Sequence, residues 1–194
     1  NVFILQDWLT IKAAEGEKPV LSQFRIEGAF AKVFLKGLII AKDSYQGEEN
    51  FWEAEAITRN SNACVYLRTD DFWGQGRDMK FEGLTLMTTE NTDSWSAADW
   101  VEKSASGFGI RNVPNVEIVN CRITNVSFGI SISEESGNAH IVNNTIQNFS
   151  ADEARLISND VYFGYNTITD CYKVDDNHDD AIQSYSVGEN WEVG

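Results

Sequence analysis

The stretch Val116-Glu-Ile-Val-Asn-Cys-Arg-Ile-Thr-Asn125 recurs twice, without gaps, further along the chain. The second copy is Ala139-His-Ile-Val-Asn-Asn-Thr-Ile-Gln-Asn148, and the third is Val161-Tyr-Phe-Gly-Tyr-Asn-Thr-Ile-Thr-Asp170. The copies start 23 and 22 residues apart. Two earlier segments, 33–41 and 79–87, follow the same pattern with a glycine at the centre. Self-similarity at a period of roughly 20 to 50 residues indicates a repeat architecture.

Each copy contains two short runs of alternating apolar and polar residues, with a bend between the runs. On a β-strand this alternation places one side chain inward and the next outward. Helical periodicity is absent from most of the chain. We therefore expect the inner positions to be buried between stacked copies: they are Ile118, Ile123, Ile141, Ile146, Phe163 and Ile168.

A third strand-like segment precedes each pair of runs. Three short strands in one period describe one turn of a parallel coil, and a turn has no core until its neighbours stack on it. At about 4.8 Å per layer, six or so coils give a solenoid roughly 29 Å long. The sequence thus predicts a single domain over residues 1–194, with loop insertions near 43–63 and 88–106. The third segments are 24–27, 64–67, 107–111, 128–132, 155–158 and 181–185.

Asparagines recur at the bend. Asn144 and Asn166 occupy the same position in successive copies, and Cys121 occupies it one copy earlier. Stacked amides at such a bend can hydrogen-bond from layer to layer and satisfy one another. We expect these asparagines to be structural.

Composition excludes several classes of partner and cofactor. The 194 residues carry 30 acidic and 15 basic side chains, which gives a formal net charge of −15. A field of that sign repels nucleic acid and anionic membranes, so neither is an expected partner. No apolar run of about 18 residues occurs, so no membrane-spanning helix is expected. The three cysteines form no Cys-x-x-Cys pair, which disfavours a zinc site.

The pattern Asn-x-x-Ile or Asn-Thr-Ile after an apolar strand resembles the right-handed parallel β-helix of the pectin lyase-like superfamily. The resemblance covers nearly the whole chain and is strongest over residues 107–186. It implies an all-β solenoid acting on an extracellular polysaccharide, and a secreted protein or one on a cell surface or virion. It also implies an active site on the face formed by the strand that opens each coil. The favoured activity is that of a lyase that cleaves a uronate polymer by β-elimination.

The stretch 174–186 places four aspartates and a histidine within six residues, directly before the strand-like segment 181–185. Carboxylate oxygens are the ligands that calcium prefers, and many polysaccharide lyases of the resembled family use calcium to bridge aspartates and substrate uronates. Such a cation would also offset the repulsion between an acidic protein and an acidic glycan. A solvated turn is the alternative, because aspartate is an ordinary turn residue. The predicted calcium ligands are Asp175, Asp176, Asp179 and Asp180.

β-Elimination also needs a base that removes the proton next to the substrate carboxylate. Arginine or lysine has this role in the resembled enzymes, which makes Lys173, Arg155 and Arg111 candidates. His178 is a further candidate, because its ordinary pKa is the nearest to neutral. Aromatic side chains in loops beside a groove suit the apolar faces of pyranose rings. The predicted substrate-binding residues are Trp95 and Trp100 in the second insertion, and Gln183 and Tyr185 after the acidic stretch.

Two other functions remain open. Asp179-Asp180 resembles the paired acidic motif of polygalacturonase-type glycoside hydrolases, and Asn91-Thr92-Asp93 resembles another of their motifs. The Gly-His-Gly and Arg-x-Lys elements expected downstream are absent. Phage tailspikes and adhesins use the same coil to bind glycans, sometimes without cleaving them.

Both ends of the sequence fall within strand-like stretches and lack an obvious capping helix. An uncapped solenoid presents unpaired strand edges. A chain truncated at both ends, or a homo-oligomer formed end to end, would each account for this.

Overall fold

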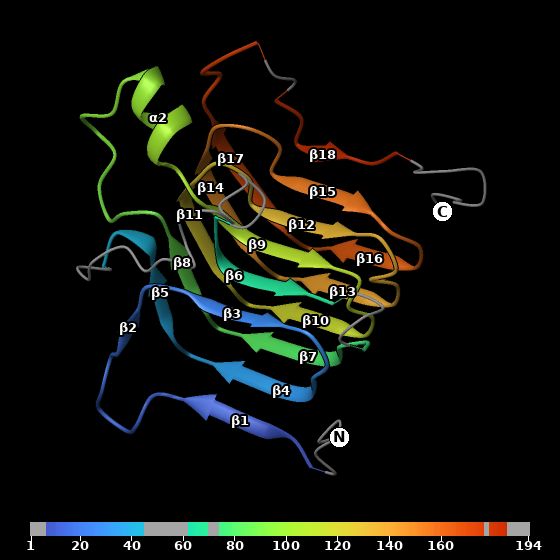
Figure 1. Ribbon diagram of the computed structural model, residues 1–194. Helices are drawn as coiled ribbons and strands as arrows, with labels where there is room; N and C mark the ends of the chain where they lie inside the picture. The colour runs from blue at the N-terminus through green and yellow to red at the C-terminus, as the bar shows by residue number, and fades with distance from the viewer. Residues whose placement is uncertain (1–6, 45–61, 70–73, 177–178, 186–194) are drawn as a thin grey trace.

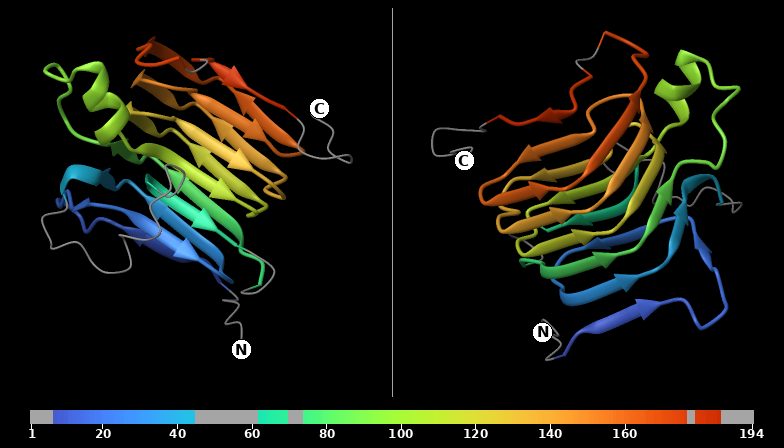
Figure 2. Two further views of the ribbon diagram at one scale, coloured as in Figure 1. Left: turned by 45° about the horizontal axis from the view of Figure 1, so that its top comes forward. Right: turned by 180° about the vertical axis from the view of Figure 1, so that it is seen from behind.

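The computed structural model describes residues 7–44, 62–69, 74–176 and 179–185, and these residues form a parallel β-helix (Figure 1). Each turn of the chain contributes one strand to each of three sheets, and each sheet has six strands. All the strand pairs are parallel, and the views in Figure 2 show the coils stacked one on the next. The predicted β-helix of about six coils is confirmed.

The sheets are called A, B and C, and the strand that opens each predicted coil lies in sheet C. Sheet A contains β1 (Leu9–Lys12), β4 (Ala31–Lys36), β7 (Arg77–Glu82), β10 (Val116–Val119), β13 (Ala139–Val142) and β16 (Val161–Gly164). Sheet B contains β2 (Val20–Leu21), β5 (Ile39–Ala41), β8 (Thr85–Met87), β11 (Arg122–Val126), β14 (Thr145–Phe149) and β17 (Thr167–Cys171). Sheet C contains β3 (Phe24–Glu27), β6 (Ala63–Arg68), β9 (Ser106–Arg111), β12 (Ile130–Ser133), β15 (Ala154–Ile157) and β18 (Ile182–Gln183).

The strand register reproduces the sequence alignment of the repeats. Val116 pairs with Ala139, and Ala139 pairs with Val161. On the other side, Val116 pairs with Met79, which in turn pairs with Val33. Residues at the same repeat position are therefore neighbours in adjacent coils. The side chains that lie in one row on an outward face can thus be read from the alignment of the repeats.

The bend between sheets A and B requires a left-handed backbone conformation in each of the last five coils. Glycine adopts this conformation without steric cost, and asparagine tolerates it better than most residues. This explains why four of these five coils have glycine or asparagine at the centre of the repeat. The residues and their φ angles are Gly37 (63°), Gly83 (62°), Asn120 (55°), Asn143 (57°) and Tyr165 (57°).

The predicted amide ladder is present next to this bend. The backbone N–H of Cys121 donates to the Asn144 side-chain oxygen at 2.8 Å, and the Asn144 amide donates to the Ile118 carbonyl at 3.0 Å. The Asn144 amide also lies 3.0 Å from the Asn166 side-chain oxygen. The Asn166 amide donates in turn to the Ile141 carbonyl at 2.9 Å. Each amide thus bonds the backbone of the coil before it.

The apolar core runs along the axis of the coil. Ile118, Ile123, Ile141 and Ile146 are fully buried, as the alternation predicts. Phe163 and Ile168 also pack against this core, as predicted, but they are only partly buried. Their strands are the last in sheets A and B among the described residues, so a neighbouring coil covers them on one side only.

Little helix is present in the described residues. A 3-10 turn, η1 (Lys42–Ser44), follows β5, and one α-helix, α2 (Ala97–Lys103), lies within the insertion predicted near 88–106. The Ser96 side chain accepts a hydrogen bond from the Asp99 backbone, and the Asp99 side chain accepts from the Ser96 backbone, so α2 begins with a capping box. Within the same described part of the chain, no helix has the length and apolar character needed to cross a membrane. Most of the insertion predicted near 43–63 lies outside the described residues.

Truncation of a core side chain tests the stacked arrangement. Ile141→Ala is expected to lower the free energy of unfolding by about 2–5 kcal/mol, because it leaves a cavity between packed layers. Urea denaturation measures the change, with His140→Ala, an outward substitution on the same strand, as the matched control. An Ile141→Ala protein as stable as the His140→Ala protein would contradict the placement of Ile141 in the core.

Candidate functional site

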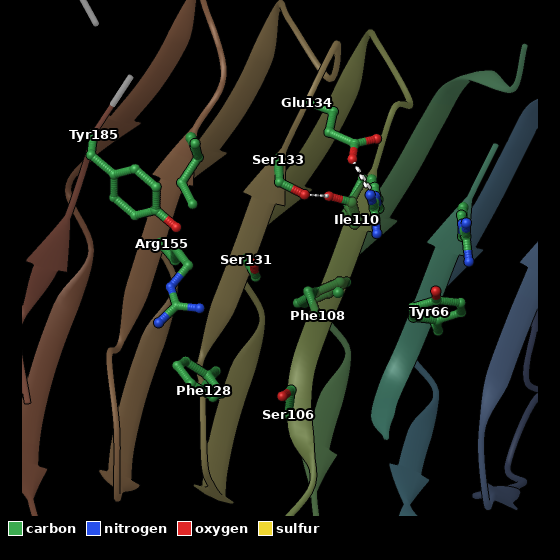
Figure 3. A pocket seen from close by; sticks show the side chains of 14 residues that line it. Tyr66, Ser106, Phe108, Ile110, Phe128, Ser131, Ser133, Glu134, Arg155 and Tyr185 are labelled. Carbon is green, nitrogen blue, oxygen red and sulfur yellow. Dashed lines mark hydrogen bonds and ion pairs between the residues drawn. The ribbon is translucent and has the colours of Figure 1, made fainter. Parts of the chain in front are cut away.

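A groove of about 310 Å³ lies along the outward face of sheet C (Figure 3). It crosses the strands β6, β9, β12 and β15 and continues to Tyr185, beyond β18. Sheet C is formed by the strand that the resemblance identified with the active-site face. The residues that line the groove are Tyr66, Arg68, Ser106, Phe108, Gly109, Ile110, Arg111, Phe128, Ser131, Ser133, Glu134, Arg155, Ile157 and Tyr185.

The strand register produces the hollow. Tyr66 pairs with Gly109, Gly109 pairs with Ser131, and Ser131 pairs with Arg155, so these four outward positions form one row across the sheet. Adjacent positions in such a row lie about 4.8 Å apart. The two central residues have a hydrogen atom or a short hydroxymethyl group as side chain, whereas the outer two are large. The middle of the row is therefore low, and its ends are raised.

A second outward row supplies positive charge. Arg68 pairs in register with Arg111 on the adjacent strand. The guanidinium group of Arg111 forms an ion pair with Glu134, and this contact raises the pKa of Arg111. Arg68 has no ion-pair partner among the described residues. Like charges directly opposite one another on adjacent strands destabilise a sheet unless a counter-charge lies nearby.

Arg155 is held at the opposite end of the groove. Its guanidinium group lies 2.7 Å from a carboxylate oxygen of Asp152, and its Nε donates to the Gln183 side-chain oxygen at 3.0 Å. The same group lies over the Phe128 ring, 4.6 Å from the centroid. Asp152 is only 2% exposed, so this pair is largely shielded from solvent. A charged, oriented guanidinium group is suited to binding a carboxylate in two-point geometry.

The acidic stretch packs directly behind Arg155. The backbone N–H of Asp180 donates to the second carboxylate oxygen of Asp152 at 3.3 Å. Both carboxylate oxygens of Asp179 are buried and have no hydrogen-bond partner among the described residues. Burial raises the pKa of Asp179, and the nearby carboxylate of Asp175 raises it further, against the opposing effect of Lys173.

The four predicted calcium ligands do not form a ready cation site in this structure. Among the described residues, no three or more histidine, cysteine, aspartate or glutamate side chains are arranged to hold a metal ion. Asp176 is exposed, and Asp175 lines a separate hollow beside α2. The calcium site stays a prediction.

The structure brings some of the other predicted site residues together and separates the rest. Arg111, Arg155 and Tyr185 line the groove, and Gln183 orients Arg155. Lys173 is exposed and does not line the groove. His178 lies outside the described residues.

The two predicted tryptophans attach the α2 insertion to the coil. Trp100 is 5% exposed, and its ring lies 5.0 Å from the Trp95 ring and 5.6 Å from the Tyr172 ring, centroid to centroid. Neither tryptophan lines the groove on sheet C. Trp100 instead lines the separate hollow, which adjoins the groove because Phe128 belongs to both.

Several groove residues are absent from the sequence predictions. Tyr66, Arg68 and Ser131 align in register with the predicted Arg155 and Arg111, so extending the repeat alignment to the third strand would have found them. The ion pair between Asp152 and Arg155 has only a weak signal in the sequence, namely an aspartate three residues before an arginine.

No protein-family model, no curated protein and no solved structure matches the chain. The resemblance to the pectin lyase-like superfamily therefore stays a prediction drawn from the repeat pattern.

One buried carboxyl group close to the groove has no partner. Glu153 is fully buried, and neither of its carboxyl oxygens has a hydrogen-bond partner among the described residues. Burial raises the pKa of Glu153 from 4.5 to about 8. The group is therefore mostly protonated at neutral pH in the folded protein, whereas it ionises in the unfolded chain.

The free energy of unfolding is expected to depend on the ionisation of Glu153. The pKa of Glu153 is higher in the folded protein than in the unfolded chain. Below pH 4.5 the group therefore does not lower the free energy of unfolding, but between pH 4.5 and about 8 the free energy of unfolding falls as the pH rises. Within this window the loss approaches about 1.4 kcal/mol per pH unit. Glu153→Gln should remove this contribution, so its stability relative to the wild type rises with pH. Urea denaturation at several pH values in this window measures the difference in free energy of unfolding between the variant and the wild type. The exposed Glu135→Gln is the control. A difference between Glu153→Gln and the wild type that does not change with pH would contradict the burial of an uncompensated carboxyl group.

Proposed function

We propose that the groove on sheet C binds an acidic polysaccharide and cleaves a uronate polymer by β-elimination. The observation that carries the proposal is the gathering of Arg68, Arg111 and Arg155 in one groove of a protein whose formal net charge is −15. Local positive charge in an acidic surface directs an anionic ligand to that place. Arg68, which forms no ion pair among the described residues, also gains a counter-charge when a carboxylate binds beside it.

The shape of the groove supports an extended sugar chain as the ligand. The low centre at Gly109 and Ser131 gives room for a pyranose ring to approach the sheet. Tyr185 is 47% exposed at one end, so a ring face is available for contact with the apolar face of a sugar. Figure 3 shows Tyr185 beside Arg155, which places an aromatic ring and a cation at the same end of the groove.

The ion pairs favour a binding role for two of the predicted bases. Glu134 forms an ion pair with Arg111, and Asp152 forms an ion pair with Arg155. A guanidinium group held in its charged form neutralises a substrate carboxylate, which makes the adjacent carbon-bound proton easier to remove. We assign this neutralising role to both arginines.

The proton acceptor then comes from another group. The hydroxyl-bearing ring of Tyr66 lines the same groove as the guanidinium groups of Arg68 and Arg111. We place Tyr66 in this role, with Lys173 and His178 as the alternatives from the sequence. In the balanced step the base takes the proton next to the carboxylate, and a carbon–carbon double bond forms as the glycosidic carbon–oxygen bond breaks. The leaving sugar oxygen keeps the electron pair of that bond and takes a proton from water.

A glycoside hydrolase is a weaker candidate. Hydrolysis of this kind uses two carboxyl groups on either side of the scissile bond. Among the described residues that line the groove, Glu134 is the only carboxylate, and it is paired with Arg111. Binding without cleavage is the stronger second candidate, because the same ion pairs suit a surface that only holds a glycan.

Binding to polyuronates tests the proposal directly. Arg68→Ala and Arg111→Ala are each expected to weaken affinity for alginate or pectate by about tenfold or more, because each removes a charge-assisted contact. Affinity electrophoresis or calorimetry measures the change. Arg122→Ala is the matched control, since Arg122 is exposed on sheet B and does not line the groove. Equal losses in all three variants, or no binding to either polymer, would contradict the proposal.

Cleavage is tested on the same polymers through the ultraviolet absorbance of the unsaturated product. Tyr66→Phe should abolish product formation while keeping polymer binding, because it removes only the hydroxyl group. Measurements in calcium and in chelator, with Asp179→Asn/Asp180→Asn as the comparison, test the predicted cation. Polymer binding without any product, in either condition, would leave glycan binding as the function.

A further inference from the structure

The outward face of sheet A carries a second groove, of about 570 Å³. Lys80, Glu117 and His140 lie in one row across β7, β10 and β13, because each pairs in register with the next. Trp8 stands at one end of the groove, where its ring lies 5.2 Å from the Lys80 ammonium group. The His140 ring lies at the other end. From Lys80 to His140 the row spans two layers, or about 10 Å.

The ends of this groove present aromatic surface. Trp8 is 40% exposed, although tryptophan is highly buried on average. The His140 ring lies 5.8 Å from the Tyr162 ring, and Tyr162 is 49% exposed. Flat aromatic surface that stays open to solvent suits a ligand with apolar ring faces, such as a pyranose.

The polar groups between these rings are fixed in place. The Asn138 amide donates to the Asn115 side-chain oxygen at 2.9 Å, and the Asn115 amide donates to Asp78 at 2.7 Å. These two hydrogen bonds set the orientation of the Asn138 amide, so that its side-chain oxygen is left as an acceptor at the groove. With Lys80 as a donor and Glu117 as an acceptor, the groove offers both kinds of partner that sugar hydroxyl groups need.

The charges of the groove compensate one another. Lys80 forms an ion pair with Glu117 at 3.0 Å, and the Asp78 carboxylate accepts from Asn115 and lies 3.6 Å from Arg77. No row of adjacent arginines occurs here, in contrast to the groove on sheet C. A groove with this balance selects against a polyanion.

We propose that the groove on sheet A is a separate binding site for an uncharged glycan, which stacks on Trp8 and His140 and hydrogen-bonds to Asn138, Lys80 and Glu117. The site does not depend on the proposed function of the groove on sheet C, because the two grooves share no lining residue and lie on different sheets. A protein with both sites would hold a neutral polymer on one face while it acts on an acidic polymer on another.

Affinity electrophoresis through gels that contain a neutral polysaccharide tests this site. The probes are a β-glucan, a xylan and a galactomannan, each in a separate gel, with pectate in a fourth. At least one neutral polymer is expected to retard the protein. Trp8→Ala and His140→Ala should each weaken that retardation by about fivefold or more, because each removes a stacking surface.

The control variants separate this site from the groove on sheet C. Tyr165→Ala removes an aromatic ring that is 81% exposed and lines neither groove, so it should not change the retardation. Arg68→Ala should leave the neutral-glycan retardation intact, and Trp8→Ala should leave the pectate retardation intact. No retardation by any of the three neutral polymers, or retardation that Trp8→Ala and His140→Ala do not reduce, would overturn the proposal.

Discussion

The hydrogen bonds of the buried Asn144 amide join three successive coils and fix their register. Its oxygen accepts from the backbone of Cys121 in the coil before, and its nitrogen reaches Asn166 in the coil after. A slip of one residue would leave these buried groups unpaired, at a cost of about 1–3 kcal/mol each. It would also turn every inward side chain of the strand outward. The amide therefore fixes both the core and the composition of each outer face.

The groove on sheet C is a consequence of this fixed register. Small residues in one row and arginines in the next produce a hollow with a positive edge, and no single loop has to shape it. The acidic stretch also supports one end of the groove, which a simple solvated turn would not do. Through the backbone N–H of Asp180 it supports Asp152, and Asp152 holds Arg155. The backbone of the acidic stretch thus supports the carboxylate of Asp152, which orients a cation in the groove.

The sequence predicted the features that repeat and missed those that occur once. The inward isoleucines and the amide ladder recur at a fixed spacing, so alignment alone located them. Arg111 and Arg155 belong to the predicted segments 107–111 and 155–158, and they lie on sheet C for the same reason. Trp95 and Trp100 were assigned to substrate binding, but their place depends on how a non-repeating insertion folds back on the coil. The burial of Glu153 also lacks a sequence signal, because it depends on packing around a position where earlier coils have Gly107 and Gly129.

The proposed function depends most on direct contact between the arginines on sheet C and the carboxylates of a glycan. Nuclear magnetic resonance of the arginine Nε–H groups, recorded during titration with a short uronate oligosaccharide, tests this claim residue by residue. The signals of Arg68, Arg111 and Arg155 are expected to shift together and to saturate, while that of Arg122 on sheet B stays in place. Shifts of equal size at Arg122, or none at the three groove arginines, would contradict the account.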